Sequence, residues 1–253
     1  MDLRLTGTRA IVTGGTKGIG RAIVELLAAE GASVAFCART EKDVQAATTR
    51  LCADGATATG TAVDVCDAAA LRTWVTQAAG ELGGIDIVVS NVSALAIGDD
   101  VDSWQKTFQT DVLGTVGLIA AAMPELEKST AGSIVTIASV SGREVDFAAG
   151  SYGAAKAAII HYTQGLAFQL AGKNIRANSV SPGNTYFDGG VWQHIEATNP
   201  QLYAQALALN PTGRMAGPDE IARAVVFLAS PAASFITGTN LVVDGALTRG
   251  VQF

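Results

Sequence analysis

The sequence predicts a single α/β domain in which a seven-stranded parallel sheet is doubly wound, with helices on both faces. Short runs rich in β-branched residues alternate with amphipathic stretches along the whole chain. These runs are apolar throughout, as expected of strands that helices cover on both sides. Right-handed crossovers between parallel strands would place the helices over the sheet. Because no linker or repeat interrupts the 253 residues, we expect one domain over 1–253.

The first predicted unit is a strand, a helix and a second strand. The run AIVT at 10–13 precedes GIGRAIVELLAAEG, in which Ile19, Ile23 and Leu26 fall on one helical face and Gly31 is placed to end the helix. We expect the remaining strands at 33–37, 58–63, 85–90, 133–139, 175–180 and 241–244. We expect the remaining helices at 41–52, 67–81, 101–127, 151–172 and 218–229.

Composition excludes several classes of protein. The formal net charge of −6 disfavours nucleic acid or an anionic membrane as the principal partner. No apolar run is long enough to span a membrane, and the charged start does not fit a signal peptide. Three cysteines without metal-ligand spacing indicate free thiols and no metal site. We therefore expect a cytoplasmic protein.

A glycine-rich turn, TGGTKGIG, follows the first strand and opens the first helix. In open parallel sheets, ligands collect at the carboxyl ends of strands, and free N–H groups at a helix start attract a pyrophosphate. Gly14, Gly18 and Gly20 would let the backbone approach such a group. The turn therefore predicts a dinucleotide site.

The end of the second strand distinguishes the two nicotinamide dinucleotides. An acidic residue there would bind the ribose hydroxyls of NAD(H), whereas an arginine would accept the 2′-phosphate of NADP(H). The chain has Arg39 at this point and Lys17 within the glycine turn. Two cations favour NADP(H) over NAD(H), although Glu41 leaves the NAD(H) alternative open. Asp64, after the third strand, is a candidate adenine acceptor.

Tyr152 and Lys156 are separated by one helical turn in SYGAAKAAI. Their side chains would share one helix face and can touch. A nearby ammonium stabilises a phenolate, which suits a tyrosine that exchanges a proton with an alcohol or ketone oxygen. We therefore interpret the pair as an acid–base centre.

With these motifs, the chain resembles the short-chain dehydrogenase/reductase family over essentially its full length. The family's glycine turn is matched by 13–20, its Tyr-x-x-x-Lys by Tyr152 and Lys156, and its catalytic serine by Ser139. Its Pro-Gly and late Thr-Gly and Val-Asp-Gly motifs are matched as well. The resemblance implies a Rossmann-like fold and a Ser-Tyr-Lys centre. It implies cofactor contacts at Gly14, Thr16, Lys17, Gly18, Ile19, Gly20, Arg39, Asp64, Val65, Asn91, Tyr152, Lys156, Pro182, Gly183 and Thr185.

Two positions depart from the family pattern. The family's Asn-Asn-Ala-Gly is replaced by SNVS, of which only Asn91 is retained. Asp111 stands where the family has a catalytic asparagine that anchors a water near the lysine. A carboxylate there would hold Lys156 protonated and partly cancel its field at Tyr152. We include Asp111 among the catalytic candidates and expect activity to persist.

Residues 183–210 break the alternation, because connections in such folds take about two to six residues. Their aromatic and apolar side chains favour a substrate lid over a hydrophobic ketone, with packing on a neighbouring subunit as an equal alternative. We expect substrate contacts at Ser139, Val140, Tyr152, Tyr186, Phe187 and Trp192. Small residues on helices 101–127 and 151–172 indicate close helix packing between subunits. Because the family commonly forms tetramers, the resemblance implies a homotetramer.

These observations predict an NADPH-dependent carbonyl reductase or secondary alcohol dehydrogenase. The alternatives are an NAD-dependent alcohol dehydrogenase, an enzyme resembling 3-oxoacyl-acyl-carrier-protein reductases, and a non-catalytic NADP-binding regulatory protein. The sequence does not distinguish substrates within the class of hydrophobic ketones and alcohols.

Overall fold

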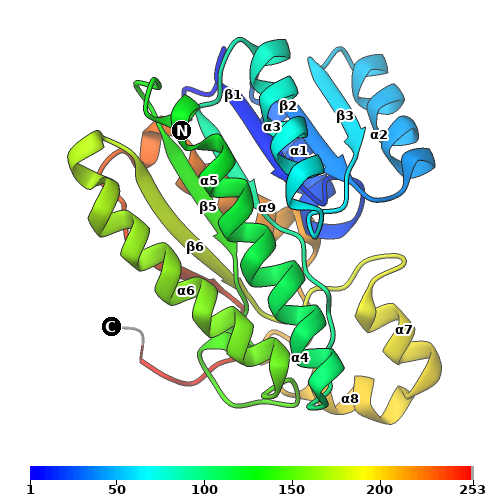
Figure 1. The fold of residues 1–253 in the computed structure, drawn as a ribbon. Helices are drawn as coiled ribbons and strands as arrows, with labels where there is room; N and C mark the ends of the chain where they lie inside the picture. Colours follow the sequence, from blue (N-terminus) through cyan, green and yellow to red (C-terminus); the bar gives the residue numbers. More distant parts are fainter. Residues whose placement is uncertain (252–253) are drawn as a thin grey trace.

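A computed structural model describes residues 1–251 and shows a seven-stranded, all-parallel sheet with strand order β3-β2-β1-β4-β5-β6-β7 (Figure 1). The predicted fold class is confirmed. Most predicted strands differ from the observed ones by one or two residues at an end. The strands are β1 (Arg9–Thr13), β2 (Ser33–Ala38), β3 (Ala58–Ala62), β4 (Ile87–Ser90), β5 (Ser133–Ile137), β6 (Arg176–Pro182) and β7 (Asn240–Val243).

Helices cover both faces of the sheet. One buried apolar cluster joins the sheet to α1 (Gly18–Ala29), α2 (Glu41–Ala53) and α9 (Pro218–Ala229). A second cluster joins the other face to α3 (Ala68–Leu82), α5 (Gly114–Leu126) and α6 (Ser151–Leu170). Figure 1 shows α5 and α6 in front of the sheet and α9 behind it. Short 3₁₀ turns at Val140–Gly142, Ala171–Lys173 and Pro231–Ala233 complete the connections.

The predicted continuous helix over 101–127 is interrupted. The segment contains α4 (Val101–Thr107), a π-helical stretch at Phe108–Leu113 and then α5. Single π-helical turns inside α-helices occur frequently at functional sites. This turn carries Asp111, whose side chain is fully buried.

Residues 183–210 hold two short helices, α7 (Val191–Thr198) and α8 (Pro200–Ala208). Asn199 ends α7 and caps α8, because its side chain accepts a hydrogen bond from the Leu202 amide. Trp192, Ile195 and Ala206 form a small apolar cluster of their own with Met215. In Figure 1 the two helices lie to one side of the sheet, so the insertion has its own core. Within residues 1–251, no helix is long and apolar enough to cross a bilayer.

Candidate active site

A cleft of about 500 Å³ opens at the carboxyl ends of the strands. The strand order reverses direction at β1, which lies between β2 and β4. Crevices at such a switch point are the usual ligand sites of open α/β sheets. The glycine turn, the ends of β2 to β5, the loop after β6 and part of α7 line the cleft. Its volume is typical of a site for a small organic ligand.

The glycine turn forms one end of this cleft. Gly14 has a φ of +72°, and a side chain at Gly20 would overlap the Gly14 carbonyl, so the turn requires both glycines. Asn91 fixes the turn to β4, since its side-chain amide donates to the Thr13 carbonyl at 3.1 Å. Lys17 occupies the N-cap of α1 without a side-chain capping bond. The first N–H groups of α1 are therefore free of side-chain capping and can bind an anion, as a pyrophosphate requires.

Beyond the turn, charged side chains line the same end of the cleft. Arg39 follows β2, and Lys17 forms an ion pair with Asp43 at 2.8 Å. Asp64 follows β3 and accepts a hydrogen bond from the Cys66 amide at 2.9 Å. Burial raises the pKa of the Cys37 thiol, which also lines the cleft, to about 12. Two cations therefore stand beside a thiol that stays neutral.

Lys156, on α6, is buried at the opposite end of the cleft. Its ammonium donates to the Ile137 carbonyl at 3.1 Å and forms an ion pair with Asp111 Oδ2, also at 3.1 Å. Its Nζ lies 5.5 Å from the centre of the Tyr152 ring. An ammonium has three N–H donors, so one remains available toward the cleft. In the described part of the chain, the Tyr152 hydroxyl has no hydrogen-bond partner, and Tyr152 lines the cleft.

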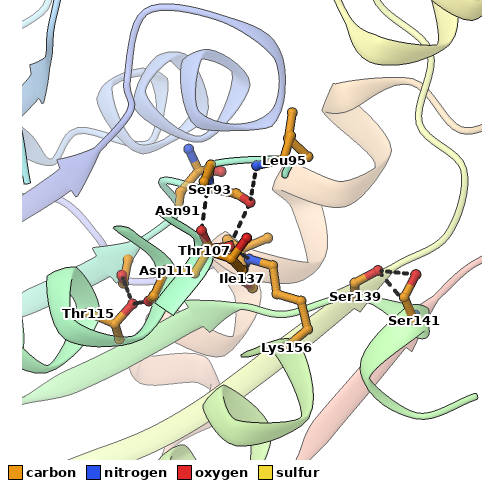
Figure 2. A network of polar contacts seen from close by, with 12 residues as sticks. Asn91, Ser93, Leu95, Thr107, Asp111, Thr115, Ile137, Ser139, Ser141 and Lys156 are labelled. Carbon is orange, nitrogen blue, oxygen red and sulfur yellow. Dashed lines mark hydrogen bonds and ion pairs between the residues drawn. The ribbon is translucent and has the colours of Figure 1, made fainter. Parts of the chain in front are cut away.

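Hydrogen bonds and one ion pair fix the Asp111 carboxylate in place (Figure 2). Its Oδ2 accepts from the Ser93 hydroxyl at 2.6 Å, and its Oδ1 accepts from the Ala94 amide at 2.7 Å. The Thr115 hydroxyl donates to its backbone carbonyl at 2.6 Å. A carboxylate that accepts from an ammonium, a hydroxyl and an amide satisfies the requirement for burying a charge. The buried charge of Asp111 is thus compensated by the Lys156 ammonium and by two hydrogen bonds.

Ser139 lies after the end of β5 and caps the turn Val140–Gly142. The Ser141 amide donates to the Ser139 Oγ at 3.2 Å, and the Ser139 hydroxyl donates to the Ser141 Oγ at 3.2 Å. The Ser141 hydroxyl in turn donates to Asp146 Oδ2 at 2.6 Å. Figure 2 shows the Ser139 and Ser141 pair separate from the cluster around Asp111. Both Ser139 and Tyr152 line the cleft.

The insertion contributes aromatic side chains to the cleft. Phe187 packs on the glycine turn, where a Cβ added at Gly18 would come within 2.5 Å of its ring. Trp192 of α7 meets Phe147 edge to face, with ring centres 5.7 Å apart. Phe187 and Trp192 therefore line the cleft from the side of residues 183–210.

Known proteins resemble this chain over nearly its full length. A family model for enoyl-(acyl carrier protein) reductases matches residues 14–248. Isoepoxydon dehydrogenase of Penicillium expansum is 39% identical over 253 residues, covering 98% of both chains. The 3-oxoacyl-[acyl-carrier-protein] reductase of Escherichia coli is 35% identical over 249 residues, covering 97% of this chain and 99% of its own.

Solved structures agree. An NADPH-bound short-chain oxidoreductase of Pseudomonas aeruginosa, named for an atypical catalytic centre, is 32% identical with a TM-score of 0.89, covering 97% of this chain and 99% of its own. An NADP complex of a Burkholderia cenocepacia short-chain dehydrogenase is 34% identical with a TM-score of 0.88, covering 96% and 99%. The chain belongs to the short-chain dehydrogenase/reductase family. The predicted resemblance is confirmed, as is the activity class, an oxidoreductase acting on CH–OH and C=O groups.

Most residues predicted for this short-chain dehydrogenase/reductase site meet in the one cleft. Among the cofactor candidates, Gly18 does not line the cleft but a small adjoining hollow with Phe187. Thr185 lines the cleft, and its hydroxyl donates to the Gly183 carbonyl at 3.1 Å. The remaining candidates that line the cleft are Gly14, Thr16, Lys17, Ile19, Gly20, Arg39, Asp64, Val65, Asn91, Ser139, Val140, Tyr152, Lys156, Pro182, Gly183, Thr185, Phe187 and Trp192.

Besides Gly18, two predicted residues do not line the cleft. Asp111 stands behind Lys156 and does not line the cleft. Tyr186 faces away from the cleft, where its hydroxyl donates to Glu196 Oε2 at 2.6 Å and its ring meets Tyr203. The hydrogen bond to Glu196 raises the pKa of Tyr186. A lid pattern in the sequence does not say which side of the lid each aromatic residue occupies.

Sequence reasoning missed three groups of this short-chain dehydrogenase/reductase site. Ser93 supports Asp111, while Ser141 and Asp146 continue the hydrogen-bond chain from Ser139. Ser93 was visible as part of the departure SNVS, and a serine opposite a new carboxylate is a paired signal. Nothing in the spacing of Ser141 and Asp146 predicts their contact.

Proposed function

We propose that this protein is an NADPH-dependent carbonyl reductase or secondary alcohol dehydrogenase whose substrate is a hydrophobic ketone or alcohol. The observation that carries the proposal is the meeting of Ser139, Tyr152 and Lys156 at one end of a cleft whose other end is a glycine turn with free helix N–H groups. Acid–base side chains and a dinucleotide cradle in one cleft suit hydride exchange at a carbonyl carbon.

The residues of the cleft fit the nicotinamide dinucleotide that the comparisons indicate. When bound, it supplies or accepts the hydride. The glycine turn and the first turn of α1 would hold the pyrophosphate, and the free N–H of Lys156 would bind a ribose hydroxyl. Tyr152 donates a proton to the carbonyl oxygen in reduction and removes it from the alcohol in oxidation. Ser139 donates a hydrogen bond to the same oxygen.

Asp111 acts in this proposal as a positioning residue. It touches neither the cleft nor the reacting atoms, but it fixes the ammonium of Lys156 from behind. Its negative charge pairs with the Lys156 ammonium and partly offsets the positive field at Tyr152. Ser93 fixes the carboxylate in turn.

The preference for NADP(H) over NAD(H) rests on Lys17 and Arg39, both at the adenosine end of the cleft. A 2′-phosphate between two cations gains charge-assisted hydrogen bonds that a ribose hydroxyl does not. The NADPH and NADP complexes of the Pseudomonas and Burkholderia relatives support the same preference. NAD(H) use is the alternative, and the affinities of the two reduced cofactors decide between them.

The proposal includes a substrate lid at 183–210 and a homotetramer. Phe187, Val191 and Trp192 support the lid, because they bring apolar surface to the cleft, Phe187 over the glycine turn and Trp192 beside Phe147. Phe168 on α6 is 89% exposed, which supports a subunit contact there, and light scattering measures the oligomeric state. Three free cysteines fit a reducing compartment and support a cytoplasmic location.

A second candidate substrate class is a 3-oxoacyl thioester, favoured by the 35% identity to the Escherichia coli reductase. A screen with NADPH and NADH against aliphatic, cyclic and aryl ketones and acetoacetyl-coenzyme A separates the classes. We expect oxidation of NADPH with aryl or cyclic ketones, its loss in Tyr152→Phe, and a shift toward NADH in Arg39→Asp. Tight NADPH binding without turnover of any member would overturn the proposal in favour of a regulatory protein.

A further inference from the structure

The catalytic serine is the first member of a hydrogen-bond chain that the proposed reaction does not use. The chain runs from Ser139 to Ser141 over 3.2 Å and from Ser141 to Asp146 over 2.6 Å. All three side chains line the cleft at the same end as Tyr152. A carboxylate therefore stands two hydrogen bonds from the group that would bind the substrate oxygen.

Asp146 is oriented before any ligand arrives. Its Oδ2 accepts from the Ser141 hydroxyl, and its Oδ1 accepts from the Ala148 amide at 2.8 Å. Within residues 1–251 it forms no ion pair, so its charge is not neutralised by a lysine or arginine. An ionised carboxylate offers about four acceptor sites, of which two are used here. The remaining lone pairs are available to a hydrogen-bond donor in the cleft.

Aromatic and aliphatic side chains line the cleft close to Asp146. Phe147 and Trp192 pack against each other beside it, and Val140 lines the same part of the cleft. The other carboxylates of the cleft, Asp43 and Asp64, stand at the adenosine end. A carboxylate without a cationic partner accepts hydrogen bonds from neutral donors and repels an anion.

We propose that Asp146 and Ser141 form a subsite for a hydroxyl group of the substrate, one or two carbons from the reacting carbonyl. The inference rests on the proposed function, and it names the substrate class as a hydroxylated ketone, or the corresponding diol in oxidation. Ser139 holds the carbonyl oxygen, Asp146 accepts from the neighbouring hydroxyl, and the aromatic pair covers the carbon frame. The same carboxylate disfavours substrates that carry a negative charge next to the carbonyl.

Binding tests the subsite without turnover. The probes are acetophenone and 2-hydroxyacetophenone, which differ by one hydroxyl, and the protein is the Tyr152→Phe variant with NADPH, measured by calorimetry. A hydrogen bond to a charged group is worth about 1.5–3 kcal/mol, so we expect about 10-fold or more tighter binding of the hydroxylated ketone. Equal affinities for the two ketones would overturn the inference.

Substitutions in the same background assign the effect to Asp146. In Asp146→Ala we expect the preference to vanish, while affinity for acetophenone stays within about twofold. Asp146→Asn keeps one acceptor for the Ala148 amide, and its NH2 can donate to the Ser141 oxygen, so it preserves the loop if the alanine variant does not fold; it should lose most of the preference. Glu144→Gln is the matched control, because it removes an exposed carboxylate of the same loop that does not line the cleft. A preference unchanged by Asp146→Asn would overturn the assignment.

Turnover by the wild-type protein separates this inference from the proposed function. Absence of NADPH oxidation with every ketone refutes the reductase but leaves the binding preference as support for the subsite. Oxidation of both ketones at equal kcat/KM, unchanged in Asp146→Asn, refutes the subsite but leaves the reductase standing.

Discussion

Two lysine–aspartate pairs stand at opposite ends of the cleft and differ almost entirely in their exposure to water. Lys17 and Asp43 are 2.8 Å apart, with 66% and 32% of their side chains exposed. Lys156 and Asp111 are 3.1 Å apart, with 2% and 0% exposed. The contact distances are nearly the same, yet the two pairs have different physical consequences.

The difference lies in what can replace each partner. Water screens the Lys17–Asp43 pair, so it contributes about 0–1 kcal/mol and opens readily when a phosphate offers a better anion. The Lys156–Asp111 pair is shielded from solvent by its burial, and Asp111 also accepts hydrogen bonds from Ser93 and Ala94. One pair is therefore exchangeable, whereas the other fixes the position of the Lys156 ammonium.

Removing one member of each pair tests most directly whether burial makes the two pairs different. Asp111→Ala leaves a buried ammonium without its anion, and we expect the free energy of unfolding to fall by about 3–5 kcal/mol in urea denaturation. Asp43→Ala is the matched control and should cost less than about 1 kcal/mol. Equal losses in the two variants would show that burial does not distinguish the pairs.

The pair between Arg9 and Asp86 lies between these extremes, with 30% and 10% of the side chains exposed. Burial alone would raise the pKa of Asp86, but hydrogen bonds from Arg9 and Ser129 outweigh it and hold this pKa below its ordinary value. Hydrogen bonds to a charged group are worth about 1.5–3 kcal/mol, and we expect Asp86→Asn to lower the free energy of unfolding at pH 7 by this order.

The pH dependence of that loss follows from the sign of the shift. A depressed folded-state pKa stabilises the protein above the ordinary carboxyl value of about 3.9, and this contribution disappears as the pH falls through the folded-state value. The difference between wild type and Asp86→Asn should therefore shrink on acidification from pH 5 to about pH 3. A difference that stays constant over this range would contradict the assignment.

The charge of Asp111, as distinct from its shape, is tested by Asp111→Asn. The amide keeps most of the hydrogen bonds but removes the charge that offsets Lys156 at Tyr152. Since a phenolate beside an uncompensated ammonium is stabilised, we expect the rising limb of the pH–rate profile for alcohol oxidation to move toward lower pH. An identical profile would show that the carboxylate takes no part in the chemistry and only supports the structure.

The smallest effect is expected at the exposed pair. Asp43→Asn frees Lys17 from a competing anion, and we expect NADPH to bind about two- to fivefold more tightly, with little change for NADH. Fluorescence titration of both cofactors at low and high salt measures this, and the gain should shrink in high salt. Tighter binding of both cofactors alike would place the effect outside the 2′-phosphate.

The sequence predicted the fold because its signals are local and repeated. Apolar runs and the glycine turn fix the strands, the first helix and the end of the cleft without reference to distant residues. The π-helical turn at 108–113 was missed because a single π turn leaves the apolar pattern of 101–127 compatible with one continuous helix. The chain from Ser139 to Asp146 was missed because it depends on the path of an irregular loop.

The π-helical turn has a consequence for how this chain tolerates change. An α-helix advances about 100° per residue. Loss of one residue from 108–113 would restore a regular helix and rotate α4 relative to α5 by about that angle. The packing of α4 and the position of Asp111 beside Lys156 could then not both be preserved. Single substitutions along this segment can therefore be tolerated one at a time. An insertion or deletion would require a simultaneous change on α6, where Lys156 pairs with Asp111.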